Sequence, residues 1–163
     1  MANAAKPVPA GFHTITPQLV LDDAAAAIEW YKRAFGAEEV SRSTPGPDGK
    51  IMHAELKIGD SHLMMNDAMM NAKGAKSRGG SATSFWLYVA DADALFTRAV
   101  GAGATVQMPL ADQFWGDRAG CVADPEGISW WIATRKEDLS MPEIQERFDA
   151  FMKQMTPAGQ PSA

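Results

Sequence analysis

Polar and aromatic side chains that could bind a ligand by stacking or hydrogen bonding are concentrated in one stretch, residues 111–133. It contains Asp112, Gln113, Trp115 and Arg118. An indole ring offers a flat face for stacking, and a guanidinium group can donate two hydrogen bonds to a carboxylate or a phosphonate. Loops carry a disproportionate share of binding residues. We therefore predict that these four side chains contact a small-molecule ligand. The alternative is that Trp115 packs the loop down and Arg118 pairs with a neighbouring aspartate.

A second polar set consists of His53, Glu55 and His62. The first two alternate with apolar residues in a predicted strand over residues 51–58, so they share one strand face. A turn at Gly59-Asp60 would bring His62 next to them on the following strand. Two imidazoles and a carboxylate are suited to binding a divalent metal ion or to proton transfer. The alternative interpretation is a solvated strand face with an ordinary cross-strand contact.

Further candidates for a pocket wall are Trp86, Trp131 and the flexible thioether of Met64. Trp130 and Trp131 are neighbours in one predicted strand, so alternation makes them face opposite ways. One of them should point to the pocket and the other to the helix layer. The single cysteine, Cys121, lies in a predicted strand and is interpreted as a small buried residue rather than a nucleophile.

The elements that must position these residues occur twice along the chain. The helix end YKRAFGA at 31–37 aligns with FTRAVGA at 96–102, with four identical positions. Around each helix the pattern predicts the same order, strand–helix–strand–strand–strand. An internal repeat fixes the architecture more firmly than any single motif. We predict an α+β fold of two tandem βαβββ modules, residues 12–70 and 82–135, within a single domain over residues 12–135.

The remaining segments flank or join these modules. Residues 1–11 are rich in Ala, Pro and Gly and are predicted to form a flexible arm, and 67–81 a mobile connection or lid. A C-terminal helix is predicted within 136–155. It opens on Ser-Met-Pro-Glu at 140–143, which fits a capping box, and carries an apolar stripe expected to dock on the body or on a partner chain. Residues 156–163 are predicted to be a frayed tail.

Composition narrows the class of protein. Of 163 residues, 46% are hydrophobic and 21% charged, as expected for a folded globular protein. The net charge of −5 argues against nucleic acid and against anionic membrane surfaces as partners, because both require clustered Lys and Arg. With one cysteine, no internal disulfide can form, and the N-terminus lacks the pattern of a signal peptide. We therefore expect a cytoplasmic protein.

Three local patterns resemble one known family: WYKRAFGAEE at 30–39, IMHAELKIGDSHLMMNDAM at 51–69 and DQFWGDRAGCVADPEGISWWI at 112–132. Together with the duplicated βαβββ order, they are similar to the vicinal oxygen chelate superfamily of glyoxalase I, extradiol dioxygenases and fosfomycin and bleomycin resistance proteins. Within it, they look like the PhnB-like branch. The resemblance implies that each half rolls into a partial barrel, that paired halves form a cup that holds the ligand, and that the protein is a homodimer.

The resemblance also implies four cup positions that hold a divalent metal ion in the metal-dependent members, where His, Gln and Glu are usual. In this sequence these positions fall at Thr16, Met64 (or Met65), Ser84 and Trp131. Hydroxyls are weak ligands for such ions, a thioether is soft and an indole cannot coordinate. We therefore predict no metal at the usual positions and no cofactor.

Three functional hypotheses follow. The favoured one is a small-molecule-binding protein without the usual metal, which takes an apolar or aromatic compound and acts in resistance or sequestration. The second is a metal-dependent glyoxalase-like lyase or dioxygenase with a divalent ion held by the displaced ligands His53, Glu55 and His62. The third is a non-catalytic interaction module whose C-terminal helix docks elsewhere. The sequence identifies no catalytic residue.

Overall fold

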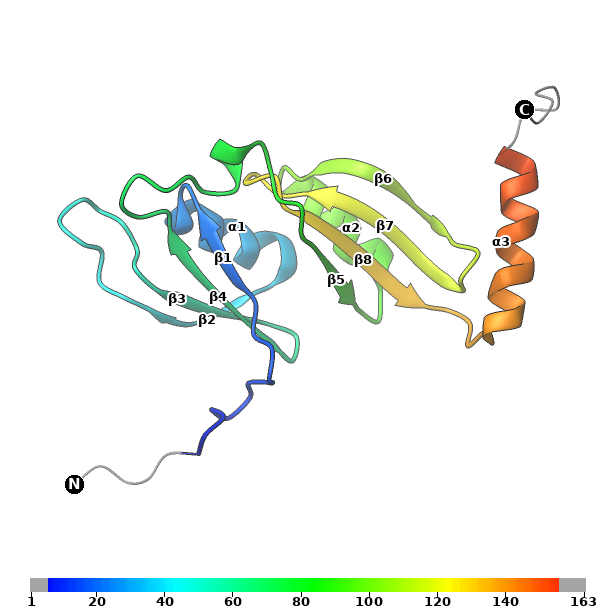
Figure 1. Cartoon of the computed structure of the whole chain (residues 1–163), viewed down its shortest axis with the longest axis horizontal. Coiled ribbons are helices and arrows are strands. Elements are labelled where there is room, and N and C mark those ends of the chain that lie inside the picture. Colours follow the sequence, from blue (N-terminus) through cyan, green and yellow to red (C-terminus); the bar gives the residue numbers. More distant parts are fainter. Residues whose placement is uncertain (1–5, 156–163) are drawn as a thin grey trace.

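Two βαβββ modules follow one another along the chain, as the repeat predicts (Figure 1). The computed structural model describes residues 6–155, so the predicted tail and the first five residues of the predicted arm lie outside the described residues. Module 1 comprises β1 (Gln18–Leu21), α1 (Ala24–Phe35), β2 (Glu38–Arg42), β3 (Ala54–Ile58) and β4 (Ser61–Asp67). Module 2 comprises β5 (Ser84–Tyr88), α2 (Ala92–Gly101), β6 (Thr105–Asp112), β7 (Asp117–Ala123) and β8 (Ser129–Arg135). A short 3₁₀ helix, η1 (Lys76–Arg78), lies between the modules, and α3 (Met141–Met155) follows them.

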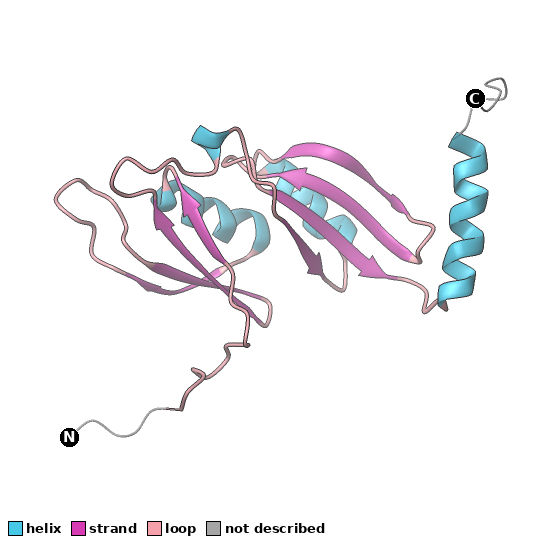
Figure 2. Cartoon of the chain, in the orientation of Figure 1, coloured by secondary structure: helices cyan, strands magenta, loops and turns pink. Residues whose placement is uncertain are grey.

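Each module folds its four strands into one mixed sheet with the same topology. The strand orders are β1-β4-β3-β2 and β5-β8-β7-β6, with β1 parallel to β4, β5 parallel to β8, and the other pairs antiparallel. Figure 2 shows the two sheets next to each other, each with one helix behind it. The α+β fold and the tandem βαβββ modules are thus confirmed. The modules form two separate sheets and meet through their helices.

The two helices begin and end as local chemistry dictates. The side chain of Asp23 accepts a hydrogen bond from the backbone N–H of Ala26 at the start of α1, and Asp91 does the same for Ala94 at the start of α2. Gly36 ends α1 in the left-handed conformation. These are the residues at which the sequence pattern predicts that the helices begin and end.

Contacts between α1 and α2 join the modules. The Trp30 indole N–H donates to the carbonyl of Ala102 at 2.9 Å, and Nε of Arg98 donates to the carbonyl of Ala34 at 2.8 Å. Three of these four residues belong to the repeated segments, 31–37 and 96–102. The repeated helix ends therefore form the contact between the two copies.

The Asp-Pro-Glu-Gly turn of module 2 also reaches module 1. The carboxylate of Asp124 accepts hydrogen bonds from the Tyr31 hydroxyl at 2.6 Å and from the Trp130 indole at 2.9 Å. Burial and this carboxylate hold the pKa of Tyr31 well above its usual value. Glu126 accepts from the backbone N–H of Asp22 at 2.9 Å, and burial raises the pKa of the Glu126 carboxyl. A turn in one module thus completes the hydrogen bonds of the other.

Three predicted strands have different limits in the structure. The strand predicted over 12–21 begins only at Gln18, after Pro17, which has no N–H to donate to a ladder. The strand predicted over 51–58 begins at Ala54, because the N–H of Ile51 donates to the side chain of Asp67 instead. The strand predicted over 104–108 continues to Asp112, so that the connection to β7 is only residues 113–116.

The connection between the modules does not stand free as a lid, contrary to the prediction for 67–81. The backbone N–H of Ala75 donates to the carbonyl of Val20, and the Asp22 carboxylate accepts from the backbone N–H groups of Gly74 and Ser77. These bonds fasten the connection to the end of β1.

The C-terminal helix forms as predicted but packs loosely. The Ser140 backbone and hydroxyl both donate to the Glu143 carboxylate, as in a capping box. Its rings Phe148 and Phe151 contact Phe114, at centroid distances of 5.3 and 5.6 Å. No residue of α3 is buried, and Figure 1 shows the helix standing beside the end of module 2. Within the described residues, no helix is both long and apolar enough to cross a bilayer.

Candidate ligand-binding site

Four aromatic side chains gather on the face of the module 2 sheet opposite α2. We call this set, Trp86, Tyr88, Trp115 and Trp131, the aromatic face. Trp86 and Tyr88 are two positions apart on β5 and therefore lie on the same face of the sheet. Trp86 is the register partner of Trp131 on β8. Their indole rings stack in parallel with centroids 4.7 Å apart. Trp115, from the connection at 113–116, meets Trp86 edge-on at 6.4 Å. Trp86 and Tyr88 remain 42% and 60% exposed, so large apolar rings are open to a ligand.

A buried carboxylate underlies this surface. Asp117, at the start of β7, is only 5% exposed. One of its oxygens, Oδ2, accepts hydrogen bonds from the Tyr88 hydroxyl at 2.9 Å and the Trp115 indole at 3.0 Å. Burial and this carboxylate raise the pKa of Tyr88, so that its hydroxyl stays a donor. Asp117 thus fixes two members of the aromatic face.

The two adjacent tryptophans of β8 point in opposite directions, as alternation predicts. Trp131 belongs to the aromatic face, whereas Trp130 is buried in the core. There the Trp130 ring packs against Phe35 and Phe85. Only Trp131 therefore belongs to the aromatic face, whereas Trp130 contributes to the wall of a cleft between the modules.

Arg118 and Asp112 lie on the opposite face of the sheet from Trp131. Arg118 follows Asp117 on β7, and so its side chain points towards α2, where it makes a bidentate pair with Asp93 at 2.6 Å. Asp112 is its register partner on β6, lies 3.2 Å from its guanidinium group and has a 79% exposed side chain. The pair with Arg118 lowers the pKa of Asp93. The structure thus shows Arg118 paired with neighbouring aspartates.

Gln113 lies beside the aromatic face, but its side chain makes hydrogen bonds to backbone carbonyls. Its side-chain N–H groups donate to the carbonyls of Ala119 and Ala111 at 3.0 and 3.3 Å, and its backbone N–H donates to the carbonyl of Asp117. The residue therefore holds the 113–116 connection in place, and with it Trp115.

The remaining candidates belong to module 1. Met64 lies on β4, between its register partners Gln18 and Glu55. His62 and Glu55 meet, with Nδ1 and Oε1 2.6 Å apart, and Phe12 stacks on the imidazole at 4.4 Å. His53 precedes β3 and is exposed. Across residues 6–155, no three His, Cys, Asp or Glu side chains are arranged to hold a metal ion.

The four positions implied by the family resemblance are divided between the modules. Thr16 precedes β1, its hydroxyl donates to the carbonyl of His13, and Met64 lies on β4. Ser84 and Trp131 lie on the module 2 sheet, where Trp131 is stacked. Two hydroxyls, a thioether and an indole do not fit a divalent ion that prefers imidazole and carboxylate ligands. We derive no chemistry through a metal at these positions.

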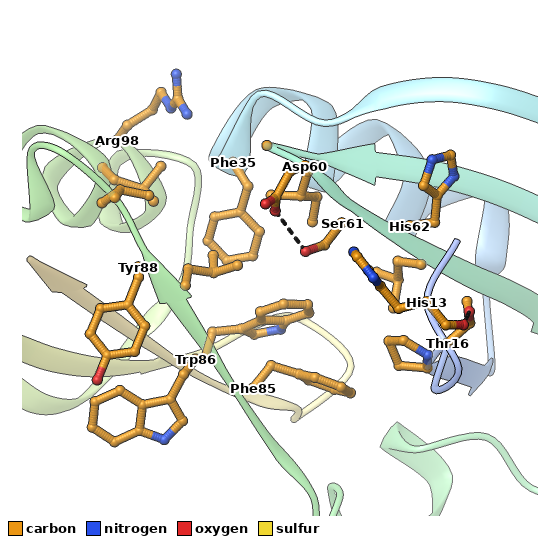
Figure 3. Close-up of a pocket in the computed structure, with 18 of the residues that line it drawn as sticks. His13, Thr16, Phe35, Asp60, Ser61, His62, Phe85, Trp86, Tyr88 and Arg98 are labelled. Atoms are coloured by element: carbon orange, nitrogen blue, oxygen red, sulfur yellow. Dashed lines mark hydrogen bonds between the residues drawn. The ribbon is translucent and has the colours of Figure 1, made fainter. Parts of the chain in front are cut away.

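A cleft of about 900 Å³ opens between the modules next to the aromatic face. Its walls are the segment 13–17, the β3–β4 hairpin at 58–63, strand β5 and the part of α2 up to Arg98, together with Phe35 and Trp130 from the core. Figure 3 shows Trp86 and Tyr88 on one side of this cleft and His13 and Thr16 on the other. Ligand pockets commonly measure roughly 300–1,000 Å³ and are lined mainly by apolar groups. The cleft and the aromatic face share Trp86 and Tyr88.

Sequence reasoning missed Tyr88 and the role of Asp117, and it implied a ligand space between the halves only through the family resemblance. Tyr88 had a signal, because it lies two residues after Trp86 in a predicted strand and must share its face. Asp117 had none, since its burial depends on the register of β7 against β8. The cleft lies between modules whose relative placement the repeat does not specify.

Comparison with known proteins agrees with this fold. The family model described as the Glyoxalase/Bleomycin resistance protein/Dioxygenase superfamily matches residues 11–132. The uncharacterized protein Rv0887c of Mycobacterium tuberculosis is 47% identical over 136 residues, which cover 80% of this chain and 79% of that protein. The crystal structure of TioX from Micromonospora sp. ML1 superposes with a TM-score of 0.62 at 29% identity, over 74% of this chain and 97% of that one. The fosfomycin resistance protein FosX from Mesorhizobium loti gives a TM-score of 0.57 at 17% identity, over 84% and 97%, and shows the fold alone.

Proposed function

Because the chain belongs to the Glyoxalase/Bleomycin resistance protein/Dioxygenase superfamily, we propose that it is a small-molecule-binding protein that uses the aromatic face in place of the family's metal chemistry. The ligand is an apolar or aromatic compound. In this proposal the ligand is held rather than transformed, and the protein acts by sequestration, as in resistance. The three local patterns at 30–39, 51–69 and 112–132 favour the PhnB-like branch.

One observation carries this proposal. Trp86 stacks on Trp131 at 4.7 Å, and its ring remains 42% exposed beside a cleft of about 900 Å³. A rigid ring that its neighbours already hold in place loses little conformational entropy when a ligand ring packs against its exposed part. The aromatic face is therefore preorganised for a flat ligand.

The proposal predicts a large loss of binding for Trp131→Ala. Removal of this ring takes away the support behind Trp86, and an aromatic pair contributes about 0.5–1.5 kcal/mol beyond its buried area. Together with the lost area, this should weaken binding of the neutral aromatic dye N-phenyl-1-naphthylamine about tenfold or more. The measurement is a fluorescence titration, with circular dichroism to verify the fold.

Arg118→Ala is the matched control. Arg118 comes from the same stretch of sequence, but its side chain points to α2 and pairs with Asp93. We expect the affinity for the dye to stay within about twofold of the wild type, because no contact with the aromatic face is lost. Equal losses in the two variants, or no binding by the wild-type protein, would contradict the proposal.

We also propose that two copies associate. The sheet face away from α1 exposes Val20 in module 1. An exposed apolar side chain on a sheet face is a candidate contact point between two copies. Light scattering should give twice the chain mass of 17.5 kDa. Val20→Asp should shift the protein towards the monomer and Val100→Asp, on the exposed side of α2, should not. A monomeric mass at high concentration would refute the association.

A further inference from the structure

The Asp117 carboxylate has no cationic partner. Both donors to its Oδ2 atom, the Tyr88 hydroxyl and the Trp115 indole, are neutral. Among residues 6–155, no Lys, Arg or His nitrogen makes an ion pair with it. Its register partner Arg135 pairs with Asp138 at 2.5 Å, and the charge of Arg135 also acts on the Tyr88 hydroxyl, where it opposes the rise in pKa. Arg118, the next residue along β7, is bound to Asp93 on the other face.

This arrangement has an electrostatic consequence. A carboxylate that is 95% buried has lost most of its water, and neutral donors replace only part of that solvation. Its charge therefore acts strongly on the space in front of it. A positive group brought from outside the protein would compensate this charge.

The rings above the carboxylate favour the same kind of ligand. The face of an aromatic ring carries negative potential and attracts cations. Tyr88 and Trp115 both donate their polar hydrogen to Asp117, and hydrogen bonds to an ionised acceptor polarise the donor groups further towards negative. Tyr88 and Trp86 are 60% and 42% exposed, and their rings stack on each other with centroids 6.0 Å apart. The chain's net charge of −5 adds a long-range attraction for cations.

We propose that the ligand of the aromatic face is an organic cation, an aromatic or alkylated ammonium or iminium compound whose positive charge lies over Trp86 and Tyr88 in the field of Asp117. This inference rests on the proposed function, since it specifies the ligand class of the same site. It goes further because stacking alone does not distinguish a cationic aromatic ligand from a neutral one.

A pair of probes with the same shape tests this directly. (4-Hydroxyphenyl)trimethylammonium and 4-tert-butylphenol differ in one positive charge and are titrated calorimetrically against the wild-type protein. We expect the cation to bind about tenfold more tightly, as for a partly desolvated cation–π site beside a carboxylate. Raising the salt concentration should weaken binding of the cation and leave that of the phenol unchanged.

Three variants then identify the residues that cause the preference for the cationic probe. Asp117→Asn should bring the two affinities within about twofold of each other, because the amide keeps the shape of the side chain without its charge. Tyr88→Phe removes one hydrogen bond to Asp117 but keeps both the ring and the carboxylate, so the preference for the cation should persist. Trp131→Ala should weaken both probes.

The possible results separate the two proposals. If both probes bind equally to the wild-type protein and both depend on Trp131, binding by the aromatic face stands and the cation preference is wrong. If neither probe binds, the proposed function fails and this inference fails with it. The wild-type comparison holds even if the Asp117→Asn chain does not fold.

Discussion

Replacement of Asp124 by alanine is expected to lower the free energy of unfolding by about 3–5 kcal/mol. One carboxylate oxygen accepts from the Tyr31 hydroxyl and the Trp130 indole, and the other from the backbone N–H groups of Glu126 and Ile128 at 2.9 Å. Alanine leaves these four buried donors without an acceptor. Because Tyr31 belongs to module 1 and the turn to module 2, the contact between the modules should weaken as well.

Urea unfolding followed by circular dichroism measures this loss. Asp112→Ala is the matched control, because its side chain is 79% exposed and its partner Arg118 retains Asp93. We expect the control to lose less than about 0.5 kcal/mol, as for surface substitutions. Similar losses in both variants would show that Asp124 does not join the modules in the way described.

The second large effect is expected at Gly74, which lies against the end of β1. A Cβ atom at this position would overlap the backbone of Leu21 and Asp22. Backbone atoms cannot move aside as a flexible side chain can, so Gly74→Ala should cost about 2–3 kcal/mol of unfolding free energy by overpacking. The hydrogen bonds that fasten the connection to Asp22 should weaken too.

Gly101→Ala makes the same chemical change in open space. No atom lies within 4 Å of the added methyl group, and the residue ends α2. Alanine favours helices over glycine, so this variant should gain up to about 1 kcal/mol. Opposite signs for the two substitutions in thermal or urea unfolding are the expected result. A neutral Gly74→Ala would mean that the connection is not packed against β1.

Other residue types stand at the positions where the family resemblance implies metal-binding side chains. Ser84 and Trp131 occupy the module 2 positions where the resemblance implies metal-binding side chains. Trp131 instead supports Trp86 from behind at 4.7 Å. In the proposed function, the aromatic face binds the ligand by stacking, in place of a metal ion that would coordinate it. The Trp131→Ala experiment tests whether binding depends on stacking, and the pair of probes tests whether it depends on the charge of the ligand.

The amino-acid sequence alone determined the architecture of this protein. Helical spacing, the caps Asp23 and Asp91 and the repeat at 31–37 and 96–102 predicted both modules, because each of these signals depends on residues close together in the chain. Strand alternation likewise predicted the opposite orientations of Trp130 and Trp131. Local periodicity is sufficient where a side chain's direction follows from its own backbone.

Only the tertiary structure decided which residues share a site. Arg118 and Trp115 are three positions apart in sequence, yet Arg118 points to α2 whereas Trp115 packs against Trp86, because β7 begins at Asp117 and Trp115 lies in the connection before it. Asp117 becomes a buried, cation-free carboxylate only through the register of β7 with β8 and the reach of Tyr88 from β5. The cleft exists only because α1 and α2 hold two separate sheets at one fixed placement. Register and module placement depend on contacts between residues far apart in the chain, and local sequence patterns carry no information about them.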